Sequence, residues 1–363
     1  MKAKRFGPAI YFASDKNIFD ALVQHGVDAP TITTLFERRN IIASKKTPRD
    51  DLAEYFSRLT HDYYDHRTIS ERLGSPSRRE RTTSMDLVGK IDPENHRLSL
   101  EEIKKEITAA GDTAHISRNG DSFSINIQYS LIDYKKTEFS QVQIKDGIIE
   151  FIPTPEGYLI RNAQNEFMNT VRDEIVTKVD KNNIEDLEII TVSLFEITTP
   201  KLRTQFFIDL INGLEGFSRR DVSDVYVYKP KPIRDGSEEL TSDDDETHIE
   251  KVLLKGNGVT RSVILLDLTG SNEYYIVKIG WTTQRELGNG DIFEIEALFS
   301  DPKDCTGFSI LLKGIYPYVN GKRGKRRSPL KSEIDEISRL IESSARSLTT
   351  KMKVTTTDGG SKS

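Results

Sequence analysis

The stretch ERRNIIASKKTPRDDLAEYFSRL, residues 37–59, determines how the first part of the chain folds. It contains the end of one amphipathic helix, predicted over about residues 31–40, then a short extended piece and the start of a second helix. Thr47 is a good N-cap and Pro48 suits the first helical position, because proline lacks the amide hydrogen that a helix start leaves unbonded. The second helix carries a core-facing stripe at helical spacing, formed by Leu52, Tyr55, Phe56 and Leu59. We therefore predict a small helical domain.

Further helices are predicted on both sides of this stretch. Ser14 can cap a helix that begins at Asp15, and a short helix is expected over residues 68–73. The helical module therefore covers residues 1–74. The segment that follows, residues 75–91, is rich in serine and arginine, and we predict a basic linker there.

Residues 92–234 are predicted to form a mixed α+β domain. The segment DSFSINIQYSLIDY (121–134) alternates apolar and polar residues, which is typical of a half-buried strand. Residues 161–179 instead carry apolar residues at helical spacing. The next segment, DGSEELTSDDDET (235–247), has seven acidic residues and no basic one, so we expect an exposed acidic linker.

Residues 248–348 are predicted to form a second α+β domain that is rich in strands and ends in a helix. SVILLDLTGSNEYYIVKIGW (262–281) contains two apolar runs around a turn sequence and predicts a hairpin of two buried strands. An amphipathic helix is expected over residues 332–348 and a disordered tail over 349–363. The predicted fold class is therefore α+β, with a helix–extended–helix domain followed by two mixed domains with antiparallel sheets.

Composition narrows the functional classes. No apolar run approaches the roughly 20 residues that a membrane helix needs, so we expect no membrane partner. The single cysteine, Cys305, excludes an internal disulfide framework and a thiolate-rich zinc site. The basic N-terminal residues precede only a short apolar segment broken by Pro8, which predicts no signal peptide. We therefore expect a cytoplasmic protein.

Charge is segregated along the chain. Residues 1–90 carry a net charge of +4 and residues 318–363 carry +6, whereas residues 91–317 carry −15, for a total of −5. Basic ends on an acidic body indicate that any contact with a polyanion is made by the ends. Solvated surfaces without a ligand would produce the same counts.

The positions that define the helical module also match a known pattern. Leu35 and Phe36 lie in the first helix, Ile41 and Ile42 in the extended piece, and Leu52, Tyr55, Phe56 and Leu59 in the second helix. This arrangement resembles the SAP and helix–extended–helix modules, over less than a tenth of the chain. Those modules usually have a glycine where this chain has Asn40, a residue that also tolerates left-handed conformations. The resemblance implies binding to DNA, or less often RNA, through the extended piece and the start of the second helix.

Elementary electrostatics supports the same ligand. The start of the second helix presents unbonded backbone amides and the positive end of the helix dipole. Asp50 and Asp51 lie at the same helix start and partly oppose an anion there. The cations placed to hold a phosphate are Lys45, Lys46 and Arg49, with Arg38 and Arg39 one element away. The alternative is a helical packing domain that contacts a protein partner.

A second basic segment lies near the C-terminus. GKRGKRRS (321–328) combines two glycines, which allow close approach to a backbone, with five nearly contiguous cations. Phosphate contact by these side chains would depend steeply on salt. A solvated loop is the alternative. The predicted contacts are Lys322, Arg323, Lys325, Arg326 and Arg327.

An enzymatic alternative needs clustered carboxylates with a lysine near strands, so that two acids can hold Mg²⁺. The nearest set is Asp267, Glu273 and Lys278. Glu273 and Lys278 lie five positions apart, not two as in the Glu-x-Lys pattern of restriction nucleases. HDYYDH (61–66) has metal-binding residue types, but its two pairs point in different directions on a helix. We predict no metal and no cofactor.

Three functions remain open. The first is a nucleic-acid-binding subunit, non-catalytic or accessory, that prefers DNA to RNA and works with a protein partner or a second copy of itself. The second is a metal-dependent nuclease with a non-standard site, and the third is a purely protein-binding structural subunit. The motif-poor acidic body with basic ends favours the first. The overall layout also resembles accessory proteins of bacterial phage-defence gene pairs, which implies a role in antiviral defence.

Overall fold

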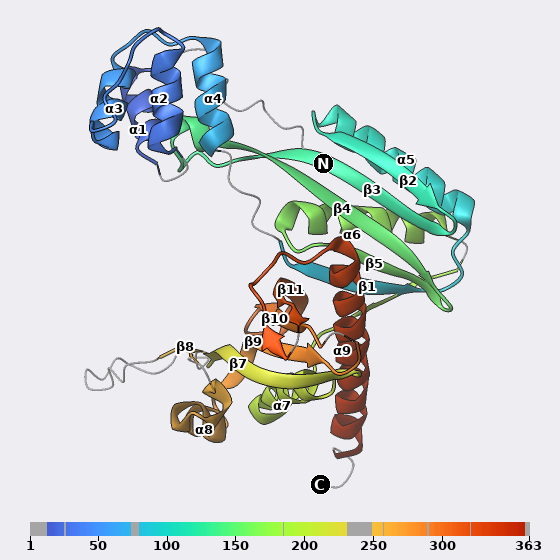
Figure 1. Ribbon diagram of the computed structural model, residues 1–363. Coiled ribbons are helices and arrows are strands. Elements are labelled where there is room, and N and C mark those ends of the chain that lie inside the picture. Colours follow the sequence, from blue (N-terminus) through green and yellow to red (C-terminus); the bar gives the residue numbers. More distant parts are fainter. Residues whose placement is uncertain are drawn as a thin grey trace, which may run out of the picture. The chain divides into compact units, whose positions relative to one another are not determined.

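The structure is a computed structural model, and it describes residues 13–24, 27–73, 80–183, 185–230, 249–256, 258–288, 290–319 and 321–359. The fold class is α+β, because helices accompany an extensive antiparallel sheet (Figure 1). The chain divides into two compact units. Unit 1 comprises Met1–Arg78, Pro93–Ile149 and Thr177–Asn182, and unit 2 comprises Arg79–Asp92, Glu150–Val176 and Asn183–Ser363.

Unit 1 begins with four short helices around a shared apolar core. They are α1 (Asp15–Leu22), α2 (Ala29–Glu37), α3 (Arg49–Ser57) and α4 (Tyr63–Leu73). Ser14 and Asn17 cap α1 reciprocally, which confirms the predicted start of that helix. The rings of Phe36 and Phe56 meet edge to face with centroids 5.3 Å apart, and they join α2 to α3.

The rest of unit 1 adds a longer helix and a hairpin. Helix α5 (Pro93–Ala109) is followed by the antiparallel strands β2 (Thr113–Asn119) and β3 (Ser122–Ile132) and by the short helix η1 (Glu138–Ser140). Phe139 in η1 packs into the core of the four helices. Strand β4 (Val142–Thr154) belongs to unit 1 up to Ile149 and then continues into unit 2.

Unit 2 is built on an antiparallel sheet. Its strands lie in the order β5-β1-β11-β10-β9-β7-β8, and β6 also pairs with β1. The strands are β1 (Thr82–Val88), β5 (Gly157–Ala163), β6 (Glu188–Thr191), β7 (Phe217–Tyr228), β8 (Lys251–Lys255), β9 (Tyr275–Arg285), β10 (Ile292–Asp301) and β11 (Thr306–Tyr316). A small hairpin, β12 (Tyr318–Val319) with β13 (Lys322–Arg323), follows β11.

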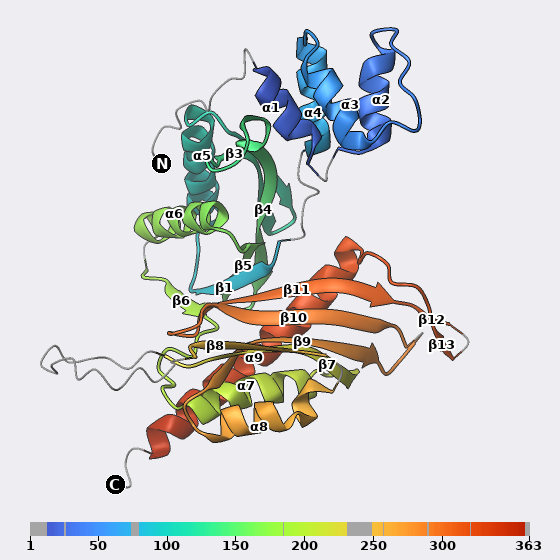
Figure 2. The ribbon, with the colours of Figure 1, turned by 90° about the vertical axis from the view of Figure 1, so that its left-hand side faces the viewer.

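The helices of unit 2 cover one face of this sheet. They are α7 (Pro200–Asn212), α8 (Val263–Gly270) and α9 (Lys331–Gly359), and the short helix η2 (Val259–Arg261) precedes α8. Most of α6 (Glu166–Asn182) also belongs to unit 2. In Figure 2, β9, β10 and β11 lie in front of α9. A buried ion pair between Arg161 of β5 and Glu342 of α9, 2.6 Å long, fastens α9 to the sheet.

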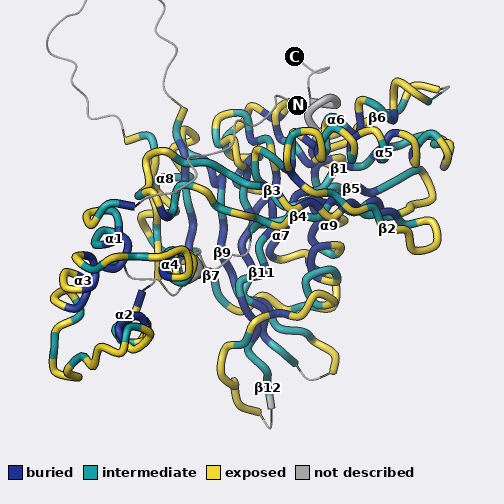
Figure 3. Tube along the Cα trace, turned by 90° about the horizontal axis from the view of Figure 1, so that it is seen from above, coloured by how far each residue is buried: buried dark blue, intermediate teal, exposed yellow. Residues whose placement is uncertain are grey.

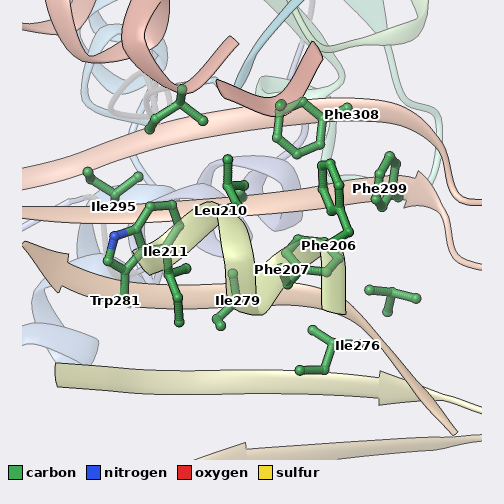
Figure 4. Close-up of a cluster of buried hydrophobic side chains, with 14 of the residues drawn as sticks. Phe206, Phe207, Leu210, Ile211, Ile276, Ile279, Trp281, Ile295, Phe299 and Phe308 are labelled. Atoms are coloured by element: carbon green, nitrogen blue, oxygen red, sulfur yellow. The ribbon is translucent and has the colours of Figure 1, made fainter. Parts of the chain in front are cut away.

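The core of unit 2 forms between these helices and the strands. Figure 4 shows side chains of α7 directed at residues of β9, β10 and β11. The ring of Phe206 lies 5.6 Å from that of Phe299 and 5.8 Å from that of Phe308. Trp281, the only tryptophan of the chain, is fully buried in the same core.

Long-range strand pairing corrects several sequence predictions. Residues 82–88, predicted as part of a basic linker, form β1, because their alternating side chains are buried once β5 and β11 pair with them. The predicted domain boundary at 235–247 falls between β7 and β8, which pair within one sheet. The acidic segment itself lies outside the described residues. Residues 263–270 form the helix α8 rather than a strand, and α9 continues through 349–359.

The helical module also differs locally from the prediction. Helix α3 begins at Arg49 with Pro48 as its N-cap, and no side chain caps it. Tyr55 is exposed instead of facing the core, whereas Leu52 and Phe56 are buried as predicted. The nine-residue helix therefore packs through a narrower stripe than its sequence indicates.

We expect replacement of Phe206 by alanine to lower the free energy of unfolding of unit 2 by about 3–5 kcal/mol, because the cavity left in a packed core does not fully collapse. Urea unfolding followed by Trp281 fluorescence measures the change. Phe195→Ala is the matched control, because Phe195 is 60% exposed and Phe206 is 0% exposed. Equal unfolding midpoints for the two variants would contradict the placement of Phe206 in the core.

Candidate nucleic-acid interface

The sheet of unit 2 has a second face that carries charge. Alternation along a strand places neighbouring side chains on opposite faces. In β10 the core side holds Phe293, Ile295, Ala297 and Phe299. Glu294 and Glu296 therefore lie on the other face, as does Lys278 in β9. The residues of β9 and β10 are largely buried or intermediate, as Figure 3 shows for β9, so the charged groups stand on well-packed strands.

Glu296 is the centre of the charged face. Its side chain is 2% exposed and accepts from three cations on three other segments. Lys313 and Lys278 place their Nζ atoms 2.7 and 2.9 Å from Oε2, and Arg81 donates its Nε to Oε1 over 3.1 Å. A buried carboxylate requires such partners, because desolvation of an unpaired charge is costly.

Asp224 in β7 adds a second, more distant carboxylate to this group. The Nζ atoms of Lys313 and Lys278 lie 3.7 and 3.8 Å from its carboxylate oxygens. Gly280 makes room for it, since a Cβ there would lie 2.2 Å from Asp224 Oδ2. Three cations thus face two carboxylates, and the cluster has a net charge of +1.

The protonation of the cluster follows from its geometry. Burial alone would raise the pKa of Glu296, but hydrogen bonds from Lys313, Lys278 and Arg81 outweigh it and lower that pKa to about 2. Burial alone would lower the pKa of Lys313, but the hydrogen bond to Glu296 outweighs burial and raises that pKa. Glu296 and Lys313 are therefore both charged at neutral pH.

The predicted basic segment 321–328 follows β11 directly. Lys322, Arg323 and Lys325 are exposed, and no described acidic side chain pairs with them. The guanidinium of Arg323 lies 3.5 Å from the ring centroid of Tyr316. Strand register opposes Ile292 to Tyr316 and Glu294 to Gly314, so Tyr316 lies on the charged face of the sheet.

The other two predicted contacts of this segment have structural roles. Arg326 donates its Nε to Glu294 over 2.8 Å and its Nη2 to the carbonyl oxygen of Lys313 over 2.6 Å. Arg327 forms a two-bond pair with Glu333 near the start of α9. These two arginines hold the hairpin segment to β11 and α9.

The cations of the helical module divide in the same way. Arg39 pairs with the buried carboxylate of Asp65, a residue of the HDYYDH segment, and Arg38 donates to Thr68 over 2.8 Å. Lys45 and Lys46 are exposed in the piece between α2 and α3, and no described acidic side chain pairs with them. Asn40, at φ 57°, adopts the left-handed conformation expected where related modules carry glycine.

Arg49 stabilises the end of α1 and is not directed at the start of α3. Its Nε donates to the carbonyl oxygen of Val27 over 2.8 Å, and its Nη2 donates to those of Leu22 and Gln24. Leu22 is the last residue of α1, and the last carbonyls of a helix lack partners within it, whereas Gln24 and Val27 lie after the helix, so Arg49 ties the end of α1 to the segment that follows.

The three catalytic candidates are not brought together. Asp267 lies on α8, and Glu273 pairs with Lys229 at 2.7 Å. Lys278 instead contacts Glu296 and Asp224. A helix in place of the expected strand accounts for the difference, because it carries Asp267 away from the register of β9. Among the described residues, no group of three or more His, Cys, Asp or Glu side chains is arranged to hold a metal ion.

Sequence reasoning missed the partners of Lys278. A signal was present for Glu296, which lies between Ile295 and Ala297 in β10, and for Lys313, which follows the apolar run 310–312 in β11. Their convergence depends on pairing between strands far apart in sequence, which one sequence does not reveal. The missed residues are Arg81, Asp224, Glu296, Lys313 and Tyr316.

Comparison with known proteins identifies no relative of this chain: no protein-family model and no curated protein matches it. Within the described residues, no helix has both the length and the apolar character needed to cross a bilayer.

We expect Glu296→Gln to destabilise unit 2 by about 3 kcal/mol at pH 7, because three cations lose a buried carboxylate. The ordinary pKa of 4.5 falls to about 2 on folding, so the wild-type advantage is complete above pH 4.5 and is lost as the pH falls towards 2. Urea unfolding between pH 7 and pH 3 measures how the free energies of unfolding of wild type and Glu296→Gln approach each other. Glu273→Gln, which breaks an exposed pair, should cost less than about 1 kcal/mol. A difference between wild type and Glu296→Gln that does not depend on pH would contradict this assignment.

We expect Arg49→Ala to accelerate amide hydrogen exchange in α1 by about tenfold or more, because three carbonyl oxygens lose hydrogen bonds to a charged donor. Exchange of peptides covering residues 15–24, measured by mass spectrometry, reports the change. Lys46→Ala should leave this exchange unaltered, since its side chain is exposed and unpaired among the described residues. Unchanged protection in Arg49→Ala would show that the arginine does not hold α1.

Proposed function

We propose that this protein binds nucleic acid, with DNA preferred to RNA, and that it does so as a non-catalytic subunit. The observation that carries the proposal is the group at the end of β11. There the guanidinium of Arg323 stacks on Tyr316 between two exposed lysines, Lys322 and Lys325. Cations without acidic partners beside an aromatic ring suit a phosphate backbone and a base or sugar lying across the ring.

The charged face of the sheet supports a longer contact. Arg81, Lys278 and Lys313 outnumber the carboxylates that they surround, so the cluster attracts an anion even though each cation already has a partner. Tyr316 lies on the same face. A strand of nucleic acid that contacts the hairpin therefore has further positive charge within unit 2.

The helical module offers a second contact in unit 1. Lys45 and Lys46 precede α3, whose first backbone amides are free of a side-chain cap. This arrangement agrees with the proposed SAP-like module and retains two of its five expected cations, because Arg38, Arg39 and Arg49 bind within the fold. Asp50 is exposed there and weakens the site.

A metal-dependent nuclease is the second candidate function. Asp224 and Glu296 lie on strands around Lys278, which is the type of grouping that such a site needs. In this chain Glu296 already accepts from two lysines and Asp224 lies at ion-pair distance from the same two, so the three cations leave no excess negative charge for Mg²⁺. Cys305 offers no alternative nucleophile, because burial raises its pKa to about 12 and keeps it a thiol. We therefore favour binding without cleavage.

The proposed setting is a cytoplasmic complex, with a role in bacterial antiviral defence. The support is the layout of the chain, in which basic ends flank an acidic body that lacks a recognisable catalytic motif. A subunit of this kind would hold nucleic acid for a separate catalytic partner.

We expect the triple substitution Lys322→Ala, Arg323→Ala, Lys325→Ala to weaken binding to a short DNA duplex and to reduce the salt dependence. Each lost phosphate contact lowers the slope of log affinity against log salt by about 0.9. Fluorescence anisotropy at several salt concentrations, with single-stranded DNA and RNA in parallel, measures both quantities. Lys45→Ala, Lys46→Ala tests the helical module in the same assay.

Lys105→Ala, Lys135→Ala, Lys181→Ala is the matched control, because it removes three exposed cations that lie outside both basic segments. If the control lost as much affinity for DNA as the hairpin variant, the loss would come from net charge and not from contacts made by the hairpin. Cleavage of the DNA with Mg²⁺ or Mn²⁺, abolished by Asp224→Asn, would instead establish the nuclease. If no nucleic acid bound at low salt, the function that remains would be that of a protein-binding structural subunit.

A further inference from the structure

Helix α8 has an apolar surface on its solvent side. Leu265 is 4% exposed and packs into the core of unit 2. On the opposite side Val263 is 69% exposed, and Ile264 and Leu266 are each 58% exposed. A surface helix normally carries polar residues there, and a helix that is apolar all round is normally covered on all sides.

Strand β8 leaves an edge of the sheet open close to this helix. It ends the strand order and pairs on one side with β7, and in the described part of the chain no strand lies on its other side. After β8 the chain returns to β7, where the backbone amide of Gly258 donates to the Asp221 carboxylate. Helix α8 then begins after Ser262. An open edge offers unpaired backbone amides and carbonyls to an added strand.

The side chains of β8 specify which strand would fit. Val252 and Leu254 point towards the core, so Lys251, Leu253 and Lys255 share the other face. Leu253 is 56% exposed between the two lysines. An antiparallel strand would therefore meet one apolar side chain flanked by two positive charges.

A second copy of this chain does not satisfy that pattern. Antiparallel pairing of two β8 strands centred on Leu253 would oppose Lys251 of each copy to Lys255 of the other, and like charges directly opposed are unfavourable. Arg261, exposed just before α8, adds to the positive rim. Charge complementarity thus favours an acidic partner.

We propose that β8 and α8 form a docking surface for an extended segment of a partner protein, added as a strand to β8. Opposite Lys251, Leu253 and Lys255 the segment carries acidic, apolar and acidic residues in turn. The two residues between them face the side of the sheet that holds Val252, Leu254 and the core-facing Leu265 of α8, and they are apolar for that reason. The recognition pattern is acidic–apolar–apolar–apolar–acidic.

The test uses a fluorescent peptide with the core Glu-Val-Ile-Val-Glu and the purified full chain. We expect saturable binding by anisotropy, lost when alternate peptide amides are N-methylated, because methylation removes the donors that a sheet edge needs. Lys251→Glu, Lys255→Glu should weaken binding at least about tenfold, since two attractive cross-strand pairs become repulsive. The same variant should gain affinity for the peptide with Lys in place of Glu.

Leu266→Asp should also weaken binding to the peptide, while Leu287→Asp, on an exposed leucine away from the proposed surface, should not. Trp281 fluorescence and the urea midpoint establish that each variant is folded. The proposal is overturned if the peptide does not bind, or if neither N-methylation nor charge reversal changes its affinity. It is also overturned if sedimentation shows a dimer that Lys251→Glu, Lys255→Glu dissociates, because the occupant is then a second copy.

Discussion

The buried carboxylate of Glu296 constrains the sheet of unit 2 more than any other single group. A charge that is 2% exposed persists only if compensating charges reach it, and here they come from the segment before β1, from β9 and from β11. Lys313 reaches it from an irregularity in the β10–β11 register, next to Gly314. A slip of one residue in β10 would turn Glu296 into the apolar core, so the ion network and the strand register enforce each other.

The same network determines what the charged face can offer to a ligand. Its lysines are held by two carboxylates and do not sweep the surface as free side chains would. A rigid array loses less conformational entropy when it binds, but it also has less unsatisfied charge. The hairpin after β11 has the complementary character, with exposed cations and a stacked Arg323–Tyr316 pair. In unit 2, a cation held by carboxylates, Lys313, and an exposed cation, Arg323, therefore lie close together in the sequence.

Local features of the fold were predictable because they depend on neighbouring residues. Ser14 caps α1, and Leu52 and Phe56 are buried at helical spacing. The apolar run at 263–268 was misassigned because a short run without alternation fits a buried strand and a short helix equally well. Strand β1 was missed because its partners lie 69 or more positions further along the chain. The candidate site shares this limitation: Lys278 was singled out, but its partners depend on which strands are adjacent.

Arg49 and Arg39 illustrate the opposite error, since sequence alone does not distinguish an arginine that binds phosphate from one that binds backbone carbonyls or a buried Asp65.

The position of β1 also affects how the protein is made. Its hydroxyl at Thr83 bonds to the carbonyl of Phe308, 225 positions later, whereas the four-helix core of unit 1 draws chiefly on residues within the first part of the chain. At about 5–20 residues per second, a ribosome needs roughly 10 to 45 s to synthesise the segment between these two residues. The helical module can be complete during that interval, while β1 waits without its neighbour β11. Strands β5 and β6 are made earlier and can pair with β1, but the part of β1 around Thr82 that meets β11 stays open until β11 is made, and a nascent chain of this design benefits from a chaperone that covers that edge.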